Sequence, residues 1–293
     1  MSGTFNWTHY DFSTAEGIRA VRAEPGINDL VESALLDEDS RPRTLVTPAG
    51  TLVILRGVNL NPGAGFEDMI SVRLWANPDR VVSTGRRRLR SVESLQADIE
   101  AGKGPTNGGE LICQLVSRLA DFLGEAVEDL ENRLDEVESH VAETRTLTRQ
   151  SPFSLLRRQC ARVRRYLGPQ REALEQLLRS PGDLLGPKDV AVLREEANRL
   201  TLILEDLDLV RERAMVAQEE FLGILAHEQN TRMLLLSIIA AIFLPLSFVT
   251  GLMGMNVAGL PGTVNPWAFV ILVLLMVGLA TGILFLFRLK RWF

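Results

Sequence analysis

Residues 233–287 read MLLLSIIAAIFLPLSFVTGLMGMNVAGLPGTVNPWAFVILVLLMVGLATGILFLF and contain no Asp, Glu, Lys, Arg or His. One membrane-spanning helix needs about 20 apolar residues, so this run is long enough for two. Its middle, NVAGLPGTVNP, is rich in the Gly, Pro and Asn that are typical of turns. We therefore expect a first span at 233–255, an outer loop at 256–266 and a second span at 267–287. Two adjacent uncharged runs of this length are rare in soluble domains, which argues against buried core helices.

The residues that flank these runs predict their orientation. A basic end, residues 288–293, follows the second span, and Arg232 precedes the first. Positively charged flanks stay in the cytoplasm. Residues 1–16 lack the basic start and apolar run of a signal peptide. We expect a protein of the cytoplasmic (inner) membrane with both termini cytoplasmic, a cytoplasmic domain at 1–232 and a transmembrane domain at 233–293.

The first part of the cytoplasmic domain, residues 1–103, combines strand and helix patterns. The predicted elements are β-hairpins at 44–55 and 69–84 and helices at 27–37 and 91–101. In the first helix, the spacing places Leu30, Ala34 and Leu35 on one face. These patterns predict an α+β subdomain with an antiparallel or mixed sheet.

No catalytic motif accompanies these elements. Residues 102–109 are rich in Gly but lack the Gly-Lys-Ser/Thr ending of a phosphate loop. Neither Cys113 nor Cys160 has a Cys or His at metal-ligand spacing, so we expect both to be small apolar side chains in a reducing compartment. We therefore expect neither an enzyme nor a bound cofactor.

A helical hairpin is expected at 104–186, with an acidic helix followed by a basic one. Asp and Glu dominate residues 121–143, whereas residues 157–179 are rich in Arg. We favour an antiparallel pair in which the two sets of charges neutralise each other; the alternative is an acidic surface that concentrates cations near a pore mouth. A net charge of -5 and the lack of interleaved aromatic residues argue against nucleic acid as a partner.

Helical periodicity resumes at residue 187 and meets no Pro before Pro245, so a stalk helix at 187–232 should run directly into the first span. Two spans cannot enclose a polar path, and a pore therefore needs several copies in a ring. The first span has hydroxyl groups and the second is almost wholly apolar. This contrast favours the first span as the pore helix and the second as the lipid-facing one.

Helical spacing places a set of first-span residues on one face that we expect to line the pore. The set is Asn230, Met233, Ser237, Ala240, Leu244, Ser247 and Gly251. Apolar rings on this face suit gating by dewetting, and its hydroxyls suit contact with a hydrated ion; packing between helices is the alternative role for the small residues. Farther back, the face includes acids that either attract cations or form a solvated surface: Glu205, Asp208, Glu212 and Glu219.

The end of the first span, LPLSFVTG at 244–251 followed by Gly254-Met255-Asn256, resembles the CorA-type divalent-cation transporters. Their hallmark is Gly-Met-Asn at the outer end of the first of two C-terminal spans. The resemblance implies a pentamer with a cytoplasmic α/β funnel. It also implies that Asn256 rings the outer mouth and receives a hydrated cation through its water shell, while Gly254 and Met255 shape the turn.

One departure bears on the identity of the ion. Magnesium members commonly have an acid just after Gly-Met-Asn, but residues 257–262 are uncharged here. This loop is more similar to the ZntB branch, which is associated with zinc and proton coupling. Transport of Zn²⁺ is the expectation, a Mg²⁺/Co²⁺ channel is the alternative, and a membrane-anchored coiled-coil sensor that transports nothing is a remote third.

Overall fold

The protein is described by a computed structural model covering residues 5–144, 152–255, 260 and 265–289. It divides into two compact units, Met1–Glu219 and Glu220–Phe293. In chain order the elements are β1 (Asn6–Asp11), α1 (Ala15–Arg22), α2 (Asp29–Leu36), β2 (Arg43–Thr47), β3 (Gly50–Gly57), β4 (Ile70–Ala76), β5 (Arg80–Gly85), α3 (Arg90–Glu100), α4 (Gly108–Thr144), α5 (Pro152–Arg179), α6 (Pro187–Met253) and α7 (Ala268–Leu289).

The first unit contains one mixed sheet with strand order β1-β5-β4-β3-β2. Both predicted hairpins are confirmed, because β2 pairs antiparallel with β3 and β4 pairs antiparallel with β5. The edge strand β1 runs parallel to β5 and was not predicted from the sequence. Two side-chain hydrogen bonds also hold β1 to β5: Trp7 Nε1 and His9 Nδ1 lie 2.7 and 2.8 Å from Ser83 Oγ.

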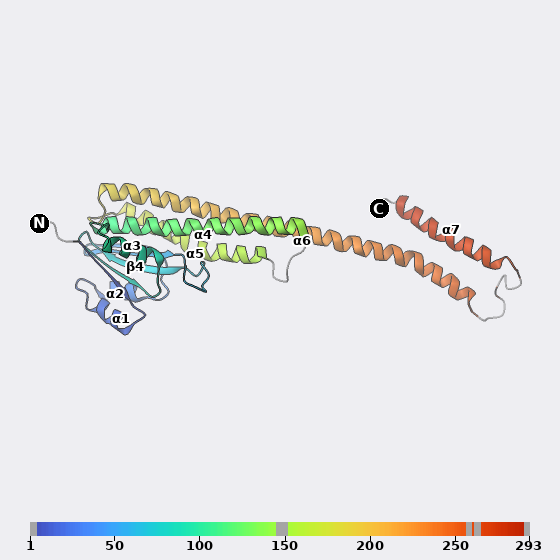
Figure 1. Cartoon of the computed structure of the whole chain (residues 1–293), viewed down its shortest axis with the longest axis horizontal. Coiled ribbons are helices and arrows are strands. Elements are labelled where there is room, and N and C mark those ends of the chain that lie inside the picture. Colours follow the sequence, from blue (N-terminus) through green and yellow to red (C-terminus); the bar gives the residue numbers. More distant parts are fainter. Residues whose placement is uncertain (1–4, 145–151, 256–259, 261–264, 290–293) are drawn as a thin grey trace. The chain divides into compact units, whose positions relative to one another are not determined.

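Helices α1 and α2 cover one face of this sheet (Figure 1). Their buried residues form a cluster with side chains of β3 and β4: Val21, Val31, Ala34, Leu35, Leu52, Ile54 and Trp75. Leu30 does not join this cluster, and its expected burial is wrong because it is 63% exposed. The buried face of α2 is formed instead by Val31, Ala34 and Leu35, with the spacing of three and four residues that one helical face requires.

Side chains that alternate with Leu52 and Ile54 along β3 point to the opposite face of the sheet. Val53 and Leu55 are fully buried there. Helix α5 covers this face, because the Thr44 hydroxyl of β2 donates to the carbonyl of Ala173 over 2.8 Å. The sheet is therefore enclosed between helices on both sides.

Three long helices of this unit run side by side, and the polar contacts between their side chains give the directions. Arg199 of α6 contacts Asp121 of α4, and Arg213 contacts Asp135; the residues of each pair are 78 apart in sequence. A constant separation means that α4 and α6 are parallel. Helix α5 is antiparallel to both. Its Arg157 contacts Gln218 of α6, whereas the later Arg164 contacts the earlier Asp208.

These contacts correct the expectation that the acidic and basic helices neutralise each other. Among the ion pairs between helices of the described residues, the acids of α4 meet arginines of α6, at 2.5 Å for Asp121 with Arg199. Outside their own helix, the arginines of α5 meet acids of α6 or of the β3–β4 connection, as Arg162 does with Asp68 at 3.3 Å. Helix α6 has charges of both signs and so pairs with both neighbours, which net charge per helix could not predict.

Helix α6 is continuous from Pro187 to Met253, as the unbroken periodicity predicted. In the second unit, its apolar part and α7 are each long and apolar enough to cross a membrane. Very little of either segment is buried, in contrast to a core helix of a soluble protein. The long helices and two C-terminal candidate spans confirm the expected fold class.

Candidate functional site

The apolar part of α6 presents large side chains to its surroundings. Leu244 and Phe248 are both 70% exposed, and Met233 is 67% exposed. Helix α7 has no buried residue at all. Surfaces of this extent need either a membrane or other protein copies around them.

The expected pore-lining residues all lie on this uninterrupted helix, so the helical period brings them to one side. Six of the seven are exposed, and Ala240 is half-buried. None of the seven is packed into a core within the single chain. Their role as a pore lining stays a prediction, because a pore needs copies of the chain.

The face offers oxygen atoms that accept hydrogen bonds. The Ser237 hydroxyl donates its proton to the carbonyl of Met233 over 2.8 Å, which leaves the Oγ lone pairs as acceptors. Pro245 lies inside the helix and has no N–H, so the carbonyl of Ala241 lacks its usual helical donor. A hydrated cation presents only water hydrogens to its surroundings, and acceptors of this kind suit it.

The outer end of the first span is described up to Met255. Helix α6 ends at Met253, and the N–H of Gly254 still donates to the Thr250 carbonyl over 2.9 Å. Asn256, the residue expected to receive the cation, lies outside the described residues, as does most of the outer loop. At the far end of that loop, Asn265 Oδ1 accepts the N–H of Trp267 over 3.0 Å and so caps α7.

The four acids expected to attract cations differ in their surroundings. Glu205, Glu212 and Glu219 are exposed on α6. Asp208 is held by Arg164 of α5, with 2.6 Å between Oδ1 and Nε. Three of the four carboxylates are therefore open to ions in solution, and the fourth is neutralised by an arginine.

No preformed cluster of three His, Cys, Asp or Glu side chains that suits a metal occurs within residues 5–144, 152–255, 260 and 265–289. Both cysteines are buried. Burial raises the pKa of Cys113 to about 12 and that of Cys160 to about 11, so neither provides a thiolate at neutral pH. They are small apolar side chains, as expected from the sequence.

Two arginines that the sequence patterns did not single out, Arg56 and Arg73, are buried in the sheet. Each lies within a strand whose other central residues are apolar, in the runs Leu55-Arg56-Gly57 and Val72-Arg73-Leu74. A charged residue inside such a run was the available signal, because an unpaired charge is rarely placed in a core.

Comparisons with known proteins agree with this architecture. The family model for "CorA-like Mg2+ transporter protein" matches residues 2–291. The divalent cation transporter CmaX of Pseudomonas aeruginosa is 41% identical over 288 residues, which cover 98% of this chain and 87% of CmaX. The zinc transport protein ZntB of Yersinia enterocolitica is 30% identical over 286 residues, with 98% and 87% of the two chains covered.

Solved structures are similar over nearly the whole chain. The structure of full-length CmaX matches with a TM-score of 0.84 at 41% identity and covers 98% of this chain and 88% of its own. The CorA magnesium transporter of Methanocaldococcus jannaschii also has a TM-score of 0.84, at 18% identity, with 96% and 89% covered. At 18% identity, the match to this CorA structure shows a similar fold and nothing more. The match of the family model to almost every residue, together with the relatives, establishes that this chain belongs to the CorA-like Mg²⁺ transporter family.

Proposed function

We propose that the chain transports divalent metal cations across the cytoplasmic membrane, with Zn²⁺ preferred and coupled to protons, as a homo-pentamer. The pore of this assembly is lined by the first span of each subunit. The observation that supports the proposal most is the face of α6 with exposed acceptor oxygens, followed directly by Gly254-Met255-Asn256. The relatives' names, divalent cation transporter and zinc transport protein, support the same function.

The chemistry of this face suits an ion that keeps its water shell. The sequence of the first span has no charged side chain to strip water from a divalent cation. Neutral oxygens such as Ser237 Oγ and the Asn256 carboxamide accept hydrogen bonds from the hydration waters instead. Dehydration is costly for a small divalent cation, so outer-sphere contact at Asn256 permits both capture and release.

The preference for zinc rests on the outer loop and on the relatives. Residues 257–262 include no acid, and proteins named for zinc transport are among those that match nearly the whole chain. A Mg²⁺/Co²⁺ channel is the second candidate, because the matching family is described by Mg²⁺. The two candidates differ in selectivity and in proton coupling, and both differences are measurable as flux.

The exposed apolar surface supports the proposed assembly. Leu244 and Phe248 on α6 and Phe269 on α7, 76% exposed, must be covered by lipid or by neighbouring copies. Two spans cannot wall a pore, so a closed ring of copies is required. In such a ring α6 faces the axis and α7 faces the lipid, with both termini in the cytoplasm.

Flux into proteoliposomes tests the function. We expect uptake of Zn²⁺ that rises with an imposed pH gradient and exceeds uptake of Mg²⁺ and Co²⁺; Mg²⁺ or Co²⁺ uptake that ignores the gradient would favour the second candidate. Native mass spectrometry of the detergent-solubilised chain should give five copies, and a stable monomer or dimer would contradict transport. Protease added to sealed right-side-out cells should leave residues 1–232 intact.

A further inference from the structure

Arg73 on β4 is buried to 1% exposure, yet most of its hydrogen-bond donors have no partner. Its Nη2 donates to the carbonyl of Asp37, in the connection between α2 and β2. Its Nε and Nη1 are buried without a hydrogen-bond acceptor in the part of the chain that the structure describes. Buried guanidinium groups normally have their donors satisfied, so this one is short of acceptors.

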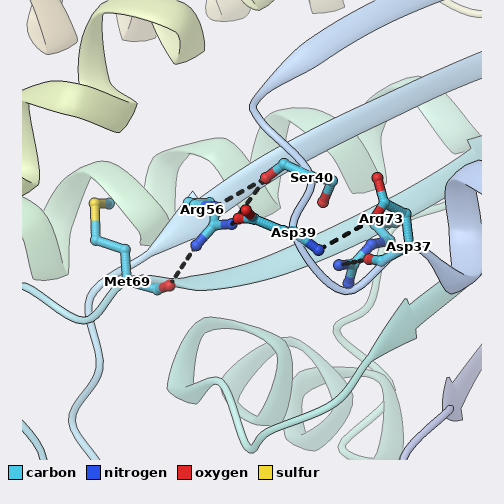
Figure 2. Close-up of polar contacts among 6 residues, drawn as sticks. All are labelled: Asp37, Asp39, Ser40, Arg56, Met69 and Arg73. Carbon is cyan, nitrogen blue, oxygen red and sulfur yellow. Dashed lines mark hydrogen bonds and ion pairs between the residues drawn. The ribbon is translucent and has the colours of Figure 1, made fainter.

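The neighbouring Arg56 on β3 shows what a satisfied arginine looks like in the same place. Its Nε and Nη2 donate to the Ser40 carbonyl over 3.1 and 2.8 Å, and its Nη1 donates to the Met69 carbonyl over 2.9 Å. Figure 2 shows how Arg56 and Arg73 both reach the segment with Asp37 and Ser40. Arg56 bonds that segment through two of its nitrogens, whereas Arg73 bonds it through Nη2 alone.

Both arginines line a cavity of about 470 Å³ in the first unit, with Tyr166 and further charged residues. The charged residues of its wall are Arg56, Arg73, Arg86, Arg87, Arg162, Arg165, Glu38, Asp39, Glu67 and Asp68. Arginines therefore outnumber carboxylates on this wall. The volume lies in the range of pockets for small molecules and exceeds the need of a water or a chloride ion.

The carboxylates of the wall are already engaged. Arg86 pairs with Glu38, and Arg56 lies 3.6 Å from Asp39. Arg162 lies 3.3 Å from Asp68 and 3.7 Å from Glu67. These pairs leave three wall arginines without a carboxylate within ion-pair distance among the described residues: Arg73, Arg87 and Arg165.

The surplus charge persists at neutral pH. Burial lowers the pKa of Arg73 to about 10, which still leaves its guanidinium protonated in the cytoplasm. Arg87 and Arg165 are exposed at the rim. The exposed charges of Arg87 and Arg165 attract an anion from a distance, and the buried charge of Arg73 attracts it once it is inside the cavity.

We propose that this cavity binds a small phosphorylated anion with at least two phosphate groups, held by Arg73, Arg87 and Arg165. The planar guanidinium fork matches two oxygens of one phosphate, which is why arginine is favoured for phosphate recognition. Arg73 lines the cavity, so its buried positive charge lies close to the bound anion, and a diphosphate spans more of the cavity than a single phosphate. The site is a binding site of the cytoplasmic domain and does not depend on the proposed transport function.

Calorimetric titration of the full-length, detergent-solubilised chain with inorganic pyrophosphate tests the site at constant ionic strength. We expect saturable binding at one site per chain. Arg87→Gln and Arg165→Gln should each weaken it about tenfold, as expected for loss of a charge-assisted hydrogen bond. Matched controls are Arg88→Gln, from the same arginine run, and Arg158→Gln, from the same helix; neither residue lines the cavity, so both should bind as the wild type does.

Titrations with other anions separate recognition from charge screening. Inorganic phosphate should bind more weakly than pyrophosphate, and sulfate and chloride more weakly still. Arg73→Gln, which removes the buried charge, should weaken pyrophosphate binding at least as much as the rim variants do; if that variant does not fold, the two rim variants decide. No binding by the wild type, equal binding of chloride and pyrophosphate, or equal weakening by the control variants would overturn the proposal.

Discussion

Arg164 of α5 donates a hydrogen bond from Nε to Oδ1 of Asp208 on α6 over 2.6 Å. This bond raises the pKa of Arg164 and neutralises one of the four acids that we expect to attract cations. Glu205, Glu212 and Glu219 are exposed and have no ion pair with any other residue that the structure describes. The four acids should therefore not contribute equally to cation capture.

Negatively charged surfaces raise the local concentration of cations. We therefore expect the triple variant Glu205→Gln, Glu212→Gln, Glu219→Gln to reduce cation flux about tenfold at low ionic strength. The reduction should fade near physiological salt, where screening shortens the reach of surface charges. Asp208→Asn is the matched control and should change flux much less. Flux into proteoliposomes at two salt concentrations measures this, and unchanged low-salt flux in the triple variant would make these acids a solvated face.

Arg213 joins α6 to α4 through three carboxylates. Its guanidinium lies 2.7 Å from Asp135, 2.8 Å from Glu138 and 3.8 Å from Glu131. We expect Arg213→Ala to lower the free energy of unfolding by about 1 kcal/mol, because partly exposed ion pairs contribute little singly and the variant leaves three acids facing one another. Arg199→Ala, which removes one close pair with Asp121, should cost less. Thermal melts at low and high salt measure both, and equal losses in the two variants would contradict the network.

Much of the fold could be predicted because local sequence patterns determine its elements. The hairpins, α6 and the two apolar runs each follow from a period of two, a period of 3.6 or the absence of charge. The sequence of β1, NWTHYD, has no apolar face, and its partner Ser83 is 76 residues from Trp7. Nothing near this strand in the sequence shows that it pairs with β5.

The candidate site divides in the same way. One helix places Ser237 and Leu244 on a common face, so the sequence suffices to predict that face. The pairing of Asp208 with Arg164, 44 residues away, depends on how three helices pack. The open donors of Arg73 depend on a cavity wall formed by several elements, and only the fold brings those elements together.

The lowered pKa of His9 on β1 should make the free energy of unfolding depend on pH. Desolvation lowers its pKa below the ordinary value of 6.5, and the nearby Asp11 opposes this with a smaller effect. As the pH falls through about 6.5, the unfolded chain binds a proton at this histidine before the folded chain does. Protons therefore favour the unfolded state, and the free energy of unfolding decreases on acidification.

We expect His9→Gln to flatten the fall in melting temperature between about pH 7 and pH 5, the window in which unfolded histidine gains its proton. His227→Gln, at an exposed position on α6, is the control and should keep the wild-type slope. Melting curves across this range measure the slopes. A His9→Gln slope as steep as that of the wild type would show that other groups cause the dependence.

Asn256 is predicted from the sequence to hold the cation at an uncharged outer mouth. We expect Asn256→Ala to abolish most flux while native mass spectrometry shows normal assembly, because the substitution removes an acceptor from every subunit of the proposed ring. Asn256→Asp should strengthen capture and slow release. Asn265→Ala, at the other end of the outer loop, is the control: it removes the cap on Trp267 N–H and should leave flux nearly intact. Wild-type flux in Asn256→Ala would reduce Gly-Met-Asn to a turn.

Substitutions of Ser237 test whether the first span or the second provides the acceptors of the proposed pore. Its hydroxyl donates to the Met233 carbonyl over 2.8 Å, and on α7 the Thr281 hydroxyl donates to the Val277 carbonyl over 2.6 Å in the same manner. Removing either hydroxyl thus breaks an equivalent bond within a helix, so the cost to folding is matched. If hydration waters of the cation bond Ser237 Oγ, then Ser237→Ala should lower flux several-fold, Ser237→Thr should retain it, and Thr281→Ala should leave it unchanged. Equal flux in Ser237→Ala and Thr281→Ala would place the acceptors elsewhere and leave Ser237 as a residue of helix packing.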